Sequence, residues 1–85
     1  MMFSKGDIVF CTAGRENGRL MCVTYCDEKF VYLCDGKERP LALPKKKNPK
    51  HIEKTNTVLS DDDMRTDRAL RKALLREVNL WQNKI

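Results

Sequence analysis

The 85-residue sequence lacks the long apolar stretches that membrane proteins and secreted precursors carry. No window approaches the roughly 18 consecutive apolar residues of a transmembrane helix. The first residues run directly into Lys5, Gly6 and Asp7, without the apolar segment of about 7–15 residues that defines a secretory signal. We therefore expect a protein of the cytoplasm that does not enter a membrane.

The sequence also has few of the residues from which active sites are built. It contains a single histidine, His51, which lies among lysines, and no glycine-rich phosphate-binding motif. A nucleophile, a base and an orienting acid cannot be assembled around that histidine. A chain of this length buries only about 60–65% of its surface, so a deep pocket would cost much of its core. We expect no catalytic activity and no cofactor.

The four cysteines form neither a disulfide pattern nor a metal-binding pattern; they are Cys11, Cys22, Cys26 and Cys34. A two-disulfide framework is typical of small secreted domains, and this sequence has no export signal. Zinc sites usually combine two close cysteine pairs, whereas only Cys22 and Cys26 lie close together here. The consecutive carboxylates at residues 61–63 point in different directions and favour solvation of a helix end over cation binding. We expect no bound metal, and cysteines that fill strand positions as small apolar residues.

The first half of the chain predicts β-strands. Short runs rich in β-branched and aromatic residues are separated by turn residues, and they cover residues 7–11, 20–26 and 30–34. Gly14 and Gly18 lie between the first two runs and suit a tight loop with positive φ values. We expect this loop to be exposed and basic, because it also carries Arg15 and Arg19.

The segment after the third run predicts a hairpin. Asp35-Gly36 is a strong signal for a type I′ turn, which needs positive φ at both central residues. A fourth strand is then expected to return through residues 37–43, with Pro40 at an edge or a bend, because proline cannot donate to a strand ladder.

The middle of the chain predicts a basic loop and a closing strand. Residues 44–51 are too polar and too proline-bounded for a core element, so they predict a loop. Residues 51–54 predict a short closing strand, and residues 55–57 a polar linker without periodicity. Several short strands separated by turns are typical of a small barrel.

Helical periodicity appears only in the last quarter of the chain. An apolar stripe repeats at helical spacing and consists of Leu70, Leu74, Val78, Trp81 and Ile85. A basic stripe about half a turn away consists of Arg65, Arg68, Lys72 and Arg76. Ser60 and Thr66 are both suitable N-caps. We expect a helix from about Thr66 to Trp81.

Positive charge is concentrated in one segment. Seventeen lysines and arginines against twelve acidic residues give a net charge of +5, and residues 45–54 carry five lysines and one glutamate. A solvated face can have the same composition. The prolines at 44 and 49 and the second basic loop at residues 12–19 favour binding to a phosphate backbone instead.

Three aromatic residues lie close together in the predicted sheet. Phe30 and Tyr32 share one face of the third strand, and Tyr25 lies near the end of the second. Exposed rings of this kind stack on unpaired bases. With six aromatic residues in the whole chain, we expect these three in the core.

Several segments resemble the KOW motif of RNA-binding proteins. Residues 5–9, Lys-Gly-Asp-Ile-Val, and residues 13–19, Ala-Gly-Arg-Glu-Asn-Gly-Arg, resemble its pattern of Gly-Asp-x-Val, a glycine, a basic residue and a second glycine before a strand. Residues 33–39, 44–52 and 66–74 are similar to short bacterial KOW-domain proteins akin to the large-subunit ribosomal protein of the fourteen-e type. The resemblance covers most of the chain.

The resemblance implies a mainly β fold, with a small SH3-like β-barrel of about five strands over residues 1–58 and a C-terminal helical extension over residues 59–85. It implies a noncatalytic, monomeric bacterial protein that functions in translation and binds RNA, either ribosomal or ribosome-associated. The residues expected to bind RNA are Gly14, Arg15, Asn17, Gly18, Arg19, Lys37, Arg39, Lys45, Lys46, Lys47, Lys50 and His51.

Two alternatives stay open at this stage. The chain is also suited to a protein-interaction adaptor that docks a partner on the barrel or on the amphipathic helix, and burial of Trp81 would argue against an open partner face. The four cysteines replace aliphatic residues typical of KOW strands, so a redox-sensing role is a further alternative.

Overall fold

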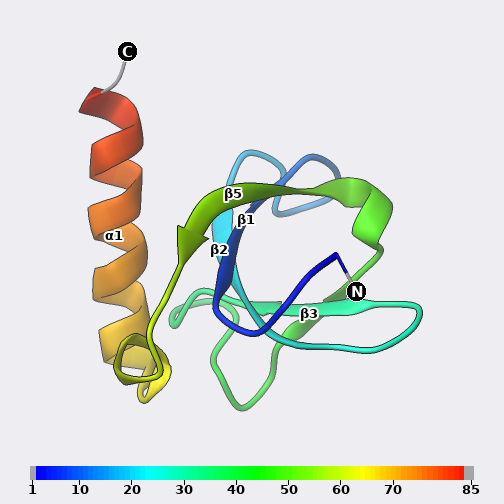
Figure 1. The fold of residues 1–85 in the computed structure, drawn as a ribbon, viewed down its shortest axis with the longest axis horizontal. Helices are drawn as coiled ribbons and strands as arrows, with labels where there is room; N and C mark the ends of the chain where they lie inside the picture. Colours follow the sequence, from blue (N-terminus) through cyan, green and yellow to red (C-terminus); the bar gives the residue numbers. More distant parts are fainter. Residues whose placement is uncertain (1, 84–85) are drawn as a thin grey trace.

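The fold is a single curved β-sheet with one long helix packed beside it (Figure 1). The computed structural model describes residues 2–83, and side chains through residue 80. In chain order the elements are β1 (Asp7–Cys11), β2 (Leu20–Cys26), β3 (Val31–Cys34), β4 (Lys45–Lys47), η1 (Pro49–His51), β5 (Ile52–Val58), η2 (Asp62–Met64) and α1 (Asp67–Asn83), where η marks a 3₁₀-helix.

The five strands form one antiparallel sheet in the order β4-β3-β2-β1-β5. This confirms the predicted mainly β fold of about five strands with a C-terminal helix. The sheet curls as in a small barrel but does not close, because β4 and β5 are its two edges. None of the helices in the described range, residues 2–83, is long and apolar enough to cross a membrane.

The first two strands match their predicted bounds, and the third begins one residue later, at Val31. The predicted fourth strand at residues 37–43 is wrong. The Asp35 carboxylate accepts hydrogen bonds of 2.9 Å from the backbone N–H groups of Lys37 and Arg39, and Leu41 N–H donates to the Asp67 carboxylate at 2.7 Å. Side chains therefore occupy the donors that a strand ladder would need. Asp35-Gly36 is also not a type I′ turn, since no described residue except glycine has a positive φ.

The loop predicted for residues 44–51 is wrong. This segment contains the edge strand β4, followed by η1. β4 pairs with β3, so that Lys46 lies opposite Tyr32. An edge strand tolerates charged side chains on its open side, and only Lys47 is buried here. The predicted linker at residues 55–57 belongs to β5, where the Thr55 hydroxyl donates to Ile8 O at 2.7 Å.

Side chains of the central strands alternate between two cores, as the period of two along a strand requires. The inner core fills the curved sheet and consists of Phe3, Val9, Cys11, Met21, Val23, Val31, Leu33 and Ile52. The outer core lies between the sheet and the helix and consists of Ile8, Cys22, Cys34, Met64, Leu70 and Leu74. Burying each large apolar side chain contributes about 1.5–3 kcal/mol, so the helix and the sheet stabilise one another.

Of the two candidate N-caps, Thr66 caps the long helix: its hydroxyl accepts a hydrogen bond of 3.1 Å from Ala69 N–H in the first turn of α1. The Ser60 hydroxyl accepts one of 3.2 Å from Asp63 N–H, but the N-cap of η2 is Asp61, whose side chain makes no cap hydrogen bond. The predicted helix is confirmed from its first turn onward. Leu70 and Leu74 of the predicted apolar stripe are buried and Val78 is half-buried, whereas the side chains of Trp81 and Ile85 lie outside the described residues.

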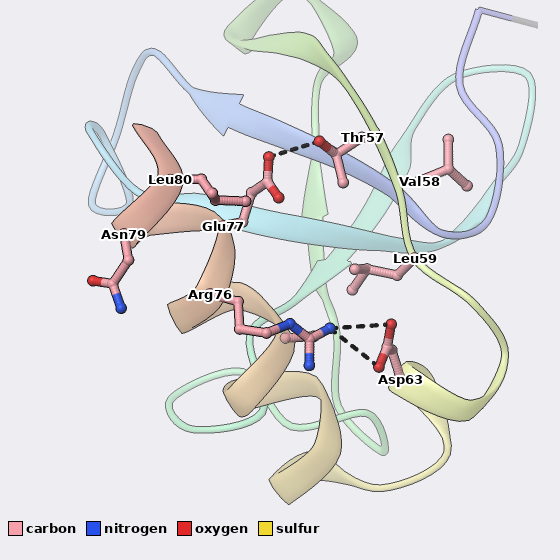
Figure 2. A pocket seen from close by; sticks show the side chains of 9 residues that line it. Thr57, Val58, Leu59, Asp63, Arg76, Glu77, Asn79 and Leu80 are labelled. Atoms are coloured by element: carbon pink, nitrogen blue, oxygen red, sulfur yellow. Dashed lines mark hydrogen bonds and ion pairs between the residues drawn. The ribbon is translucent and has the colours of Figure 1, made fainter. Parts of the chain in front are cut away.

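Two polar contacts attach the middle of α1 to the rest of the molecule (Figure 2). The Thr57 hydroxyl on β5 donates to the Glu77 carboxylate at 2.6 Å, and the Arg76 guanidinium lies 3.5 Å from the Asp63 carboxylate. Between these contacts lies a cavity of about 440 Å³, which Leu59 and Leu80 help to line. The helix is thus joined to β5 by the Thr57–Glu77 hydrogen bond, with the cavity beside that bond.

The three consecutive aspartates have three different basic partners: Lys5 for Asp61, Arg65 for Asp62 and Arg76 for Asp63. Their carboxylates point apart, as the sequence predicts, and the arrangement is one of separate ion pairs at the start of the helical region.

Candidate nucleic-acid interface

Three basic segments that are separate in the sequence meet around the two-glycine loop, residues 12–19. Thr12 N–H donates to His51 O at 2.9 Å and joins the loop to η1. The Arg19 guanidinium donates to Glu38 at 2.7 Å, which joins the loop to the turn after β3. The tertiary structure therefore brings most of the expected RNA-binding residues into one region, which we call the basic-loop surface: residues 12–19, 35–39 and 45–51.

Gly14 and Gly18 both take positive φ values, 79° and 87°, as the sequence predicts. At Gly14 a second constraint applies, because a Cβ there would lie 2.9 Å from the Lys47 ammonium. The loop folds back on itself through hydrogen bonds from Asn17 N–H to Gly14 O and from Gly18 N–H to Cys11 O. Arg15 and the side chain of Asn17 are left exposed at its tip.

A buried ion cluster, which we call the Glu16 cluster, fixes the two-glycine loop and consists of Glu16, Lys47 and Arg39. The Lys47 ammonium donates to Ala13 O at 2.8 Å and to the Glu16 carboxylate at 3.3 Å, and Arg39 donates to the other Glu16 oxygen at 3.2 Å. The side chains of Lys47 and Glu16 are only 8% and 5% exposed. Burial by itself raises the pKa of Glu16, but the hydrogen bonds from Arg39 and Lys47 outweigh it and leave this pKa below its ordinary value.

Ion pairs change the expected role of three cations. Lys47 and Arg39 share Glu16, and Arg19 pairs with Glu38, so in this structure the three cations shape the surface and two glutamates offset two of their three charges. The hydrogen bonds from Arg19 hold the pKa of Glu38 below its ordinary value, which keeps that pair charged. The sequence does not predict either glutamate as a partner, because an acid among basic residues gives no signal of which cation it will meet in the fold.

The remaining cations of the basic-loop surface make no ion pair among the described residues. They are Arg15, Lys37, Lys46 and Lys50, which are exposed, and Lys45, which is half-buried in β4. His51 is also exposed and carries the backbone contact to Thr12. Lys46 points to the opposite side of β4 from Lys47, since neighbouring residues of a strand alternate.

The prediction that the three aromatic residues lie in the core is wrong. Tyr25 is exposed, and Phe30 and Tyr32 are half-buried beside Lys46 at the edge of the sheet. Phe30, Tyr32 and Lys46 line a shallow hollow of about 560 Å³ together with Asp27, Glu28 and Lys29. Tyr25 is not part of this lining, but its ring lies beside that of Tyr32. The sequence indicates that Phe30 and Tyr32 share a face, but not that this face lacks a covering element.

The cysteines lie in the strands as small buried residues. Cys11, Cys22 and Cys34 are buried and Cys26 is half-buried, and all four are free thiols. Burial raises the pKa of Cys22 and of Cys34 to about 12, and it also raises the pKa of Cys11. These three thiols are therefore protonated and poor nucleophiles at neutral pH. Among the described residues, no group of three or more His, Cys, Asp or Glu side chains is placed to hold a metal.

No protein-family model matches this chain. No curated protein matches it either. The resemblance to KOW proteins rests on the residues named above, and the function is inferred from the chemistry and geometry of the basic-loop surface.

Proposed function

We propose that this protein is a noncatalytic RNA-binding module and that the basic-loop surface contacts the RNA backbone. The observation that carries the proposal is the convergence of the two-glycine loop with β4 and η1, which places Arg15 and Lys50 on adjoining exposed segments. Unpaired cations on neighbouring loops suit a chain of phosphates, where lysine supplies a point charge and arginine can donate two hydrogen bonds to one phosphate.

The Glu16 cluster prepares this surface for binding. A loop that is fixed by buried ion pairs and backbone hydrogen bonds loses little conformational entropy when a ligand arrives. Arg15 is then presented on a rigid loop, and its contact with a phosphate does not have to order the chain first.

The test compares two double variants that remove the same charge from different surfaces. Arg15→Ala with Lys50→Ala alters the basic-loop surface, and Arg68→Ala with Lys72→Ala alters the exposed back of α1. Binding is measured by fluorescence anisotropy with a labelled single-stranded RNA of about 12 nucleotides at low salt. We expect the first variant to weaken binding roughly tenfold or more and the second to change it less than twofold. Equal losses would show that only net charge matters, which would contradict the proposed surface.

For the partner, we propose ribosomal RNA in a bacterial cell, in keeping with the resemblance to KOW proteins. The tagged protein is expected to co-sediment with ribosomal particles on a sucrose gradient at low salt, and to shift to the top of the gradient when Arg15 and Lys50 are replaced. RNA crosslinking followed by sequencing would identify the contacted segment. Crosslinks spread evenly over messenger RNA would contradict a ribosomal partner.

A protein-docking role has one observation in its favour. Leu75, Leu80 and Val58 are exposed large apolar side chains on α1 and β5, and Leu80 and Val58 border the cavity of Figure 2. Replacing Leu75 and Leu80 by Ala is expected to leave RNA binding unchanged. Loss of co-sedimentation with unchanged RNA affinity would instead assign this side of the molecule to a protein partner.

A further inference from the structure

Three side chains form a row across the end of the sheet. Tyr25 on β2 pairs with Tyr32 on β3, and Tyr32 pairs with Lys46 on β4. Residues directly opposite one another in a sheet point to the same face. The two tyrosine rings lie 5.4 Å apart between centroids and are tilted by 40°.

A bulge in β2 creates this row. The register shifts between Val23 and Tyr25, so that Tyr25 rather than Thr24 is the partner of Tyr32. Without the extra residue Tyr25 would lie opposite Val31, which is buried in the inner core. The bulge therefore turns the Tyr25 ring away from the core and toward the surface. There, 60% of Tyr25 is exposed. An exposed ring in a small protein loses burial energy that its core needs, which points to a contact with something outside the chain.

The turn between β2 and β3 is fixed in shape beside the rings. The Asp27 carboxylate accepts hydrogen bonds from the backbone N–H groups of Lys29 and Phe30, at 2.8 and 2.7 Å, and from the Tyr32 hydroxyl at 3.3 Å. These bonds, those from the backbone first, hold the pKa of Asp27 below its ordinary value. The Phe30 ring in turn lies 4.6 Å from the Lys46 ammonium. The hollow is thus built before any ligand binds.

We propose that the row of Tyr25, Tyr32 and Lys46 is a stacking site for an unpaired base of a single-stranded RNA, a proposal that rests on the function proposed above. Tyr25 presents a free ring face at one end of the row, and a base has a π-face of its own to stack on it. Lys46 stands at the other end and meets the phosphate that follows the stacked base. Asp27 and Glu28 also line the hollow, where their carboxylates repel phosphate, whereas Lys29 and Lys46 attract it.

The stacking site and the basic-loop surface are joined through β4. Lys46 and Lys47 are neighbours in this strand, with Lys46 at the aromatic hollow and Lys47 beneath the two-glycine loop. An RNA strand that contacts Lys50 can therefore continue along β4 to Lys46. The module then prefers unpaired RNA, because a base within a duplex cannot leave its stack to reach Tyr25 without a cost.

The experiment measures the affinity of the full chain for two probes at the same salt: an oligoadenylate of about eight nucleotides and an RNA duplex of the same length. Tyr25→Leu removes the π-face but keeps apolar bulk in the strand, and Tyr25→Phe keeps the ring. Leu43→Ala is the control, since it alters a side chain that is 72% exposed elsewhere.

We expect Tyr25→Leu to weaken oligoadenylate binding roughly 5- to 150-fold, the range for one stacked base, and to change duplex binding less than twofold. Tyr25→Phe and Leu43→Ala are expected to match the unaltered protein. If Tyr25→Leu leaves oligoadenylate affinity unchanged, or lowers duplex affinity equally, the stacking site is wrong while RNA binding stands. If the unaltered protein binds neither probe, the RNA-binding function fails and the stacking site with it.

Discussion

At the scale of single residues, Glu16 is the group on which the basic-loop surface depends. It is the buried counter-ion of Lys47 and also binds Arg39, and so fixes two of the cations that the sequence predicts as RNA contacts. Cations that pair with a buried carboxylate fix the shape of the basic-loop surface. Cations without such a partner, such as Arg15, leave their positive charge available to a ligand.

Replacing Glu16 by Gln should lower the free energy of unfolding by about 3 kcal/mol, because Lys47 would stay buried without a full counter-charge. Urea unfolding followed by circular dichroism measures this. Glu38→Gln is the matched control, and it should leave the free energy of unfolding nearly unchanged because its pair with Arg19 is exposed. Adding Lys47→Met to Glu16→Gln should recover part of the loss. A Glu16→Gln protein as stable as the control would contradict the role of the cluster.

The same cluster predicts how stability depends on pH. The folded pKa of Glu16 lies below its ordinary value, so its contribution is present above about pH 4.3 and is lost as the pH falls through the folded pKa. The difference in stability between the unaltered protein and Glu16→Gln should therefore be constant near neutral pH and shrink below about pH 4. Urea midpoints at several pH values measure it. A difference that does not shrink as the pH falls below the ordinary pKa of glutamate would argue against Glu16 as the titrating group.

The buried cysteines predict slow thiol chemistry. With pKa values of about 12, Cys22 and Cys34 form almost no thiolate at pH 8, and access to their sulfurs requires opening of the outer core. A colorimetric thiol reagent should react rapidly with no more than one thiol per chain, the half-buried Cys26, and with four after denaturation. Rapid reaction of all four thiols in the folded protein would revive the redox-sensing alternative.

At the scale of elements, Gly36 determines how the helix docks on the sheet. A Cβ at this position would lie 2.3 Å from Asp67 O and 3.1 Å from Arg71 N, so the first turns of α1 rest directly on the glycine. Its φ is +80°, which residues with a Cβ rarely adopt. The sequence marks Gly36 as a hairpin residue, but the structure requires glycine there because the helix approaches so closely.

Gly36→Ala should therefore destabilise the protein by at least about 3 kcal/mol, since backbone strain and the clash with α1 add together. Gly18→Ala is the control: its φ is also positive, at +87°, but nothing lies within 4 Å of the added Cβ, so about 1–2 kcal/mol is expected. Thermal unfolding of both variants gives the comparison. Equal losses would mean that backbone conformation alone requires glycine and that the helix contact is loose.

At the scale of the whole molecule, the net charge of +5 does not say which cations can meet a ligand. Some cations are held in ion pairs, and others are free to bind phosphate. Five cations of the basic-loop surface are not ion-paired in the described structure: Arg15, Lys37, Lys45, Lys46 and Lys50. If each meets one phosphate, the logarithm of affinity for single-stranded RNA should fall against the logarithm of salt with a slope of about −3.5. A salt titration by fluorescence anisotropy tests this. A slope near −5.6, the value for about eight contacts, would mean that Arg19, Arg39 and Lys47 leave their carboxylates on binding.

Local pattern predicts most of the elements but not the edges of the sheet. β1, β2 and the start of α1 follow from β-branched runs, helical spacing and the cap at Thr66, because these signals act within a few residues. β4 was missed, since a strand of three lysines has no local preference for strand and exists only because β3 offers it a partner. The predicted strand at residues 37–43 failed for the opposite reason, because the Asp35 and Asp67 side chains take its donors.

The sequence by itself determined the mainly β class, the two-glycine loop, the amphipathic helix and the location of positive charge along the chain. Only the tertiary structure decided which cations are available, because burial and the approach of Glu16 from another segment cannot be derived from local spacing. It also decided that Tyr25 faces outward, since a single bulge changes the face to which every later side chain of the strand points.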